Sequence, residues 1–98
     1  MEETEFLKAA GEKLLNLQEK LEDENDDVSC IINGHVLTAE LDDGGEVVVN
    51  IQAPMQEIWL ASFAGGYHFK LVDGVWRENH SERSLDDMAQ EAVDKMRR

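Results

Sequence analysis

The 98-residue chain has one cysteine and few basic residues, and each shortage excludes some classes of protein. A single cysteine, Cys30, excludes an intrachain disulfide and favours a reducing compartment. Cys30 lies in a short apolar run, where a buried, inert thiol is a better interpretation than a nucleophile or a metal ligand. No apolar run approaches the length needed to span a membrane.

The chain also lacks targeting and catalytic signatures. Three of its first five residues are acidic, and this segment has neither the basic flank nor the apolar stretch of a signal peptide, so we expect a cytoplasmic protein without membrane attachment. No nucleophile motif, glycine-rich phosphate loop, calcium loop or cysteine cluster is present. We therefore predict that the protein is not an enzyme, and that any metal binding is shallow and weakly selective.

Charge of one sign dominates the sequence. Against 22 Asp and Glu stand only 9 Lys and Arg, which gives a formal net charge of −13. A negative field of this size repels nucleic acids and anionic lipids and attracts cations and basic proteins. A role in solubility alone remains the alternative interpretation.

Residues 4–22 are predicted to form an amphipathic helix with Thr4 as its N-cap. Apolar residues recur there every three or four positions, which places them on one face of the helix. A second helix is predicted to start at Ser84, because its spacing to Asp87 is that of a capping box. Apolar positions between Leu85 and Met96 supply the buried face of that helix.

Between residues 28 and 77 the pattern changes to short runs separated by turn residues. Strands are expected at 28–32, 35–41, 46–51, 57–63, 67–71 and 75–77, with tight turns at Asn33-Gly34, Gly65-Gly66 and Asp73-Gly74. Each helix has one apolar face, and the sheet needs one face covered. We therefore predict a single α+β domain over residues 1–98, a two-layer sandwich with both terminal helices on one face of an antiparallel β-meander.

The acidic residues are concentrated at the start of the chain. Residues 1–27 hold ten carboxylates and three lysines. Six of the ten carboxylates, on the first helix and before the first strand, are candidate metal ligands: Glu12, Glu19, Glu22, Asp23, Asp26 and Asp27. Carboxylate oxygens suit iron, manganese, calcium and magnesium. A solvated helix face without a ligand is the alternative.

Strand alternation predicts a second surface. Side chains alternate between the two faces of a strand, and the apolar sets must face the helices. The solvent face of the sheet then carries Asn50, Gln52, Trp59, His68 and Lys70. A tryptophan exposed among amides and a histidine is typical of a protein-interaction hot spot. A tryptophan that only covers the sheet is the alternative.

Three central segments are distinctive: Asn50-Ile51-Gln52-Ala53-Pro54, Ile58-Trp59-Leu60-Ala61-Ser62 and Gly65-Gly66-Tyr67-His68-Phe69. Together they resemble the central part of the frataxin family, in particular its bacterial, CyaY-type branch. The likeness extends in the right order over nearly the whole chain and includes the acidic end of the first helix.

This resemblance implies the same sandwich fold and an adaptor that regulates iron–sulfur cluster assembly. Such an adaptor binds ferrous and ferric iron weakly through an acidic ridge, which also binds the cysteine desulfurase. Carried over by position, the acidic ridge is Glu12, Glu19, Glu22, Asp23, Asp26 and Asp27. The sheet surface that would contact the desulfurase and the scaffold protein is Asn50, Gln52, Trp59 and His68. We expect a monomer, and consider oligomers only with excess iron.

Several positions depart from the family pattern. Ile51 stands where a basic residue is usual, so we expect one partner contact to be missing from the sheet. Leu7 replaces a histidine of some bacterial members, and Ser29 and Ile31 replace acidic residues of the first strand. Two other functions stay open: a ferroxidase that stores iron, and an acidic interaction module without a physiological metal.

Overall fold

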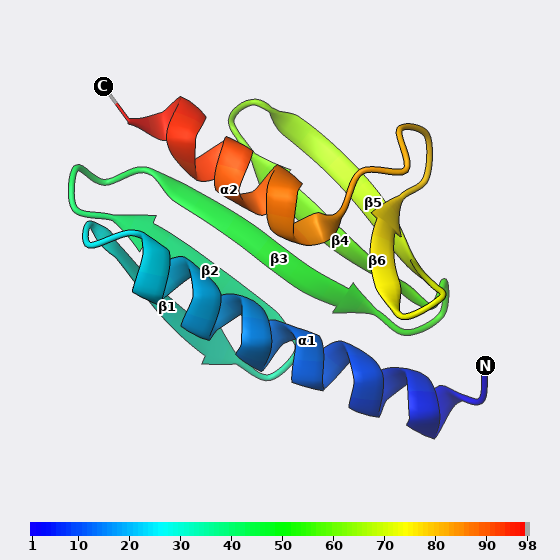
Figure 1. Ribbon diagram of the computed structural model, residues 1–98. Coiled ribbons are helices and arrows are strands. Elements are labelled where there is room, and N and C mark those ends of the chain that lie inside the picture. Colours follow the sequence, from blue (N-terminus) through cyan, green and yellow to red (C-terminus); the bar gives the residue numbers. More distant parts are fainter. Residues whose placement is uncertain (98) are drawn as a thin grey trace.

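A computed structural model describes residues 1–97 and shows two layers, a six-stranded sheet and two helices that cover one of its faces (Figure 1). In chain order the elements are α1 (Glu3–Glu24), β1 (Val28–Asn33), β2 (Val36–Leu41), β3 (Glu46–Gln52), β4 (Glu57–Ser62), β5 (Gly65–Val72), β6 (Val75–Glu78) and α2 (Leu85–Met96). The strands follow one another in the sheet from β1 to β6, each antiparallel to the next. The predicted α+β sandwich with a β-meander is confirmed.

Helix α1 starts one residue before its predicted limit and ends two residues after it. Its buried stripe is the predicted one: Phe6, Ala10, Leu14, Leu17 and Leu21. The prediction of Thr4 as N-cap is wrong, because the Glu2 carboxylate accepts a hydrogen bond from the Thr4 backbone N–H at 3.2 Å. An anionic side chain there also interacts favourably with the helix dipole. At the other end, the Asn25 amide donates to the Leu21 carbonyl at 2.8 Å and satisfies a terminal acceptor.

The φ angles of their glycines allow two of the hairpin turns to be compared with the predicted ones. The predicted Asp73-Gly74 turn is confirmed, with φ of 49° and 82°. The turn between β1 and β2 lies one residue later than predicted, at Gly34-His35, since Asn33 still pairs within the strand ladder. Only Gly34 has a positive φ there, as expected when glycine takes the first position of a type II′ turn.

The turn between β4 and β5 also differs from its prediction. Gly65 and Gly66 lie inside the strand ladder, where Gly65 pairs with Ser62. The chain reverses instead at Phe63-Ala64, and the Ser62 hydroxyl stabilises the bend by accepting a hydrogen bond from the Ala64 N–H at 3.2 Å. A local side-chain acceptor has outweighed the general preference of glycine pairs for turns.

Helix α2 begins as predicted after Ser84, whose hydroxyl accepts a hydrogen bond from the Asp87 N–H at 3.1 Å. The helices run side by side in the same direction (Figure 1). Lys13 lies 2.5 Å from Asp86 at the start of α2. Further along, the Asn25 and Gln90 amides exchange two hydrogen bonds.

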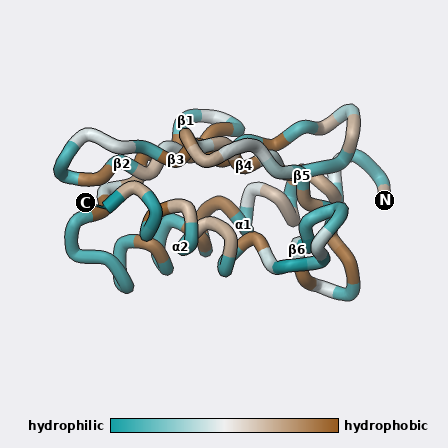
Figure 2. Tube along the Cα trace, turned by 90° about the horizontal axis from the view of Figure 1, so that it is seen from above, coloured by the Kyte–Doolittle hydropathy of each residue, from teal (hydrophilic) through white to brown (hydrophobic). Residues whose placement is uncertain are grey.

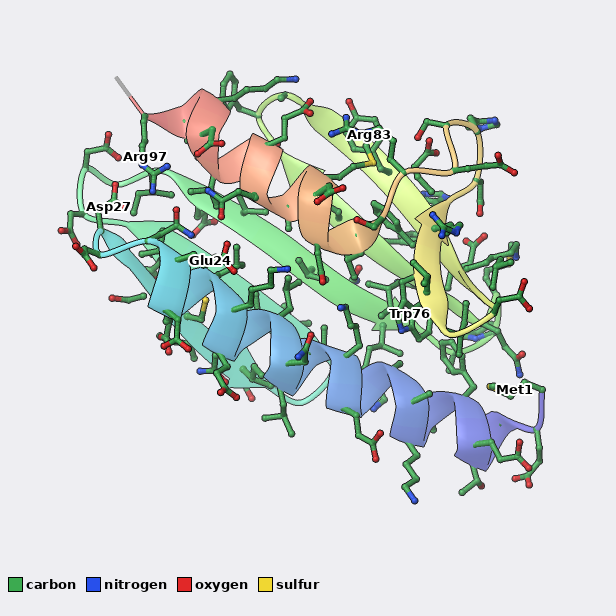
Figure 3. The ribbon with its side chains drawn as sticks, viewed as in Figure 1. Met1, Glu24, Asp27, Trp76, Arg83 and Arg97 are labelled. Atoms are coloured by element: carbon green, nitrogen blue, oxygen red, sulfur yellow. The ribbon has the colours of Figure 1, made fainter. Side chains whose placement is uncertain are left out.

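The core lies between the helices and the sheet, which Figure 2 shows from the edge. Trp76 of β6 packs against Phe6 of α1 with ring centroids 6.0 Å apart, and lies beside that helix in Figure 3. Cys30 is buried as predicted; burial, with a contribution from the charge of Glu22, raises the pKa of its thiol to about 11. Within residues 1–97, neither helix is both long and apolar enough to cross a membrane.

Candidate functional site

The outward face of α1 carries a stripe of three carboxylates. Each residue turns an α-helix by about 100°, so Glu12, Glu19 and Asp23 lie within about 40° of one another around the axis. All three are exposed and point away from the sheet, on the side of α1 opposite the buried stripe. Within residues 1–97 none of them has an ion-pair partner or a side-chain hydrogen bond. These carboxylates are therefore available to a cation or a basic surface.

Glu22 has a structural contact as well as a place in the acidic ridge. One of its carboxylate oxygens accepts a hydrogen bond from the Cys30 backbone N–H at 2.8 Å. The Gln18 amide donates to the Cys30 carbonyl at 3.2 Å. Strand β1 is one of the two edge strands of the sheet, and these side chains satisfy backbone groups that an edge strand leaves unpaired.

Asp27 forms an ion pair with an arginine from the other end of the chain. The Arg97 guanidinium contacts both of its carboxylate oxygens, at 2.8 and 3.0 Å, and also reaches Asp94 and Asn25 at 2.6 Å (Figure 3). The hydrogen bonds from Arg97 hold the pKa of the Asp27 carboxyl below its usual range. Asp26, next to it, is exposed and has no such partner within the described residues.

The carboxylates of the acidic ridge are spread over a surface and do not form a compact metal site. Among residues 1–97, no three His, Cys, Asp or Glu side chains converge closely enough to hold a metal ion. The ridge carboxylates therefore do not converge on one point, whereas a tight oxygen site surrounds its ion with six or more ligands.

The four predicted residues of the sheet surface lie together on the face opposite the helices. Asn50, Trp59 and His68 are direct neighbours across β3, β4 and β5. The Trp59 and His68 rings are stacked, with centroids 4.3 Å apart and planes 7° from parallel. Gln52 is half-buried in the adjacent row. Their predicted place on this face is confirmed, but Asn50 and Trp59 are half-buried rather than exposed, and His68 alone of the four is exposed. Their role in binding stays a prediction.

Sequence reasoning missed one residue of this surface, Glu57. It is 3% exposed although it lies on the outer face of the sheet, directly across from Gln52. Its carboxylate accepts hydrogen bonds from the Trp59 indole N–H at 2.9 Å and the Asn79 amide at 2.9 Å, and lies 3.1 Å from the Lys70 ammonium. Burial alone would raise the pKa of Glu57, but these donors outweigh it and lower the pKa to about 2.

The alternation of β4 could have placed Glu57 on this face, because residues 57 and 59 share one side of the strand. Its burial could not have been inferred that way, since Asn79 follows a different strand. The same alternation bears on Ile51, which is 7% exposed and points toward the helices. The structure therefore places position 51 of this chain in the core and not on the sheet surface. The expected loss of a partner contact there stays a prediction.

Together the fold and the two surfaces define a class of protein: a small acidic α+β sandwich with carboxylates along one helix and a tryptophan–histidine stack on the opposite layer. Residues 1–97 match the frataxin-like domain, and the chain belongs to that family. The resemblance of the central segments to frataxins is confirmed.

Individual relatives agree with this assignment. The chain is 38% identical over 95 residues to the iron–sulfur cluster assembly protein CyaY of Vibrio atlanticus, covering 97% of this chain and 91% of that protein. Its fold matches frataxin of Psychromonas ingrahamii, from the CyaY family, with a TM-score of 0.89 and 28% identity over 97% of this chain and 90% of the other. Trimeric yeast frataxin complexed with ferrous iron matches with a TM-score of 0.74 and 31% identity, over 89% and 83% of the two chains.

Proposed function

We propose that this protein is an adaptor that regulates iron–sulfur cluster assembly. In this proposal the acidic ridge binds iron and a cysteine desulfurase, and the sheet surface contacts the assembly complex that includes the scaffold protein. The observation that carries the proposal is the exposed stripe of Glu12, Glu19 and Asp23, which has no cationic partner within residues 1–97. The name of the Vibrio atlanticus relative, an iron–sulfur cluster assembly protein, supports the same role.

Iron would bind on part of the acidic ridge rather than over all of it. Arg97 neutralises Asp27, and Glu22 already accepts a hydrogen bond from β1. Four carboxylates of the acidic ridge are exposed and without such contacts: Glu12, Glu19, Asp23 and Asp26. The last three lie close together in the chain around the end of α1, so we assign them the largest share of the iron. Exposed carboxylates that do not converge bind cations weakly, which suits iron that must be released again. The yeast relative complexed with ferrous iron supports iron as the metal.

The desulfurase would bind the acidic ridge through a basic surface. Opposite charges on two proteins accelerate their encounter and are weakened by salt. The sheet surface lies on the other layer and remains accessible when the acidic ridge is covered. One molecule can therefore contact two components of an assembly complex at once. We place this activity in the cytoplasm, where the single buried thiol of Cys30 needs no disulfide partner.

The test compares two charge reversals of equal size. The double variant Glu19→Lys with Asp23→Lys changes the acidic ridge, and Glu40→Lys with Glu46→Lys changes an exposed cross-strand pair on the other layer. Binding to a purified bacterial cysteine desulfurase is measured by isothermal titration calorimetry at 50 and 200 mM salt. We expect the ridge variant to lose at least about tenfold in affinity and most of its salt dependence, and the control to lose much less.

Iron is tested on the same variants by NMR titration under anaerobic conditions. Ferrous iron should broaden backbone signals at Glu19, Asp23 and Asp26 in the unmodified protein and in the control, but not in the ridge variant.

Equal loss of desulfurase binding in both variants would mean that net charge alone drives the association, and would reject the assignment of the acidic ridge.

The two alternative functions give different results. A ferroxidase would accelerate aerobic oxidation of ferrous iron and form oligomers, as the trimeric assembly of yeast frataxin suggests. The adaptor predicts no turnover and a monomer at low iron, measured by absorbance and analytical ultracentrifugation. An interaction module without a physiological metal would bind the desulfurase with an affinity that iron does not change.

A further inference from the structure

Glu57 is a buried carboxylate on the outer face of the sheet, and the proposed function leaves it without a role. Its donors come from three different segments: Trp59 from β4 itself, Lys70 from β5 and Asn79 from the loop that follows β6. A charged group is rarely buried unless it is paired and hydrogen-bonded. Here each carboxylate oxygen has at least one donor within 3.1 Å.

These contacts determine how the Trp59 indole lies. The Glu57 carboxylate holds the indole N–H at 2.9 Å, and the His68 imidazole is stacked on the ring plane with centroids 4.3 Å apart. His68 itself lies 3.6 Å from Glu57, on the same side of the carboxylate that receives the indole. An indole that is held both at its polar end and on one ring face has little remaining freedom around its two side-chain torsions.

We propose that Glu57 is a positioning residue, which holds the Trp59–His68 stack in the arrangement that the assembly complex recognises. This inference rests on the proposed role of the sheet surface. A side chain that is already ordered before binding loses less conformational entropy when a partner packs against it. Glu57 would therefore contribute to affinity while lying beneath the contact surface.

The charge of Glu57, and not only its shape, is needed for this role. An ionised carboxylate accepts hydrogen bonds at both oxygens, whereas a glutamine replaces one oxygen with an NH2 donor. In a Glu57→Gln variant that NH2 group must face either the Trp59 N–H or the donors from Asn79 and Lys70. One set of contacts is lost in either orientation, although the side chain keeps its length.

The first test measures the indole without any partner. In 15N-labelled protein the two tryptophans give separate indole signals, and buried Trp76 serves as an internal reference. We expect Glu57→Gln to shift the Trp59 signal and lower its heteronuclear NOE, while the Trp76 signal stays unchanged. Glu91→Gln is the matched control, because Glu91 on α2 also receives two cations, Arg83 and Lys95, away from the sheet surface. An unchanged Trp59 signal in Glu57→Gln would overturn the inference.

The second test measures binding to a reconstituted complex of a bacterial cysteine desulfurase and its scaffold protein. We expect Glu57→Gln to lose about three- to tenfold in affinity, from the entropy of one side chain that must be ordered. Glu91→Gln should bind as the unmodified protein does. If Trp59→Ala weakens binding and Glu57→Gln does not, the positioning role is wrong. If the unmodified protein does not bind the complex, the proposed function fails, and the indole measurement alone decides on the positioning of Trp59.

Discussion

At the scale of single residues, the environment of a group determines what its chemistry can do. Glu57 is ionised although it is buried, because three donors surround it. Asp27 belongs to the acidic ridge by sequence but is neutralised by Arg97. Burial, with the nearby charge of Glu22, raises the pKa of the Cys30 thiol to about 11, so the thiol stays protonated even at mildly alkaline pH. Residue type therefore identifies candidates, and local contacts decide which of them are available.

The carboxylate of Glu57 should make stability depend on pH. Its pKa of about 2 in the folded protein lies below that of an unfolded chain, so it stabilises the fold above pH ~4.5 and loses this effect as the pH falls toward 2. Glu57→Gln should cost on the order of 2 kcal/mol at pH 7 and about half of that at pH 3. Urea unfolding at both pH values measures the difference. An equal cost at the two values would show that the charge contributes nothing.

The thiol of Cys30 should resist alkylation in the folded protein. Only the thiolate reacts, and burial disfavours both its formation and access by the reagent. We expect iodoacetamide at pH 8 to modify Cys30 only after unfolding in urea, as followed by mass spectrometry. A Ser29→Cys, Cys30→Ala variant supplies the control, because position 29 is exposed on the same strand and should react in the native state. Rapid alkylation of native Cys30 would contradict the burial.

At the scale of elements, α1 serves two purposes on its two sides. The inward stripe, including Leu14 and Leu17, packs against the sheet, and the outward side carries the exposed carboxylates. The close spacing of like charges on the outward side destabilises the helix to some degree. Packing of the inward stripe must compensate for that repulsion, which explains why the helix forms despite its acidity.

Substitutions on the two sides of α1 should therefore differ sharply. Leu17→Ala removes a fully buried side chain and should reduce the free energy of unfolding by about 2–5 kcal/mol. Leu15→Ala, two residues away and 61% exposed, should change it by less than about 0.5 kcal/mol. Chemical denaturation monitored by circular dichroism measures both. Similar losses would mean that the helix contacts the sheet differently from the structure.

At the scale of the whole molecule, the net charge of −13 works against the compact state. Ion pairs such as Arg97–Asp27 and Arg83–Glu91 offset part of the repulsion, but the acidic ridge has no such partner at Glu19 or Asp23 among residues 1–97. The acidic ridge, which we propose as a binding surface, therefore also destabilises the fold. Binding of a cation or a basic protein would relieve the repulsion and stabilise the fold.

Salt should therefore raise the melting temperature. Between 20 and 300 mM sodium chloride the screening length falls from about 20 Å to about 6 Å, which weakens repulsion between exposed carboxylates. We expect Tm to rise with salt in the unmodified protein, and to rise less in the Glu19→Lys, Asp23→Lys variant, which starts from a higher Tm. Differential scanning calorimetry measures both. A Tm that is independent of salt would show that the repulsion is already neutralised.

Much of this protein was predictable because its signals are local. The apolar stripe of α1, the Ser84 cap, the Asp73-Gly74 turn and the alternation of β3 to β5 each depend on residues close together in the chain. The helix–meander–helix order follows from them, because each apolar face needs a partner. The alternation also placed Ile51 inward.

Only the tertiary structure decided which polar groups meet. The Arg97–Asp27 pair joins residues 70 positions apart, and the contact of Asn79 with Glu57 depends on the path of the loop after β6. Neither has a periodic or short-range signal in the sequence. The sequence alone determined the two layers and the excess of carboxylates. The packing of distant segments decided which carboxylates are paired, buried or available, because hydrogen bonds and ion pairs depend on distances of a few ångströms that no local pattern specifies.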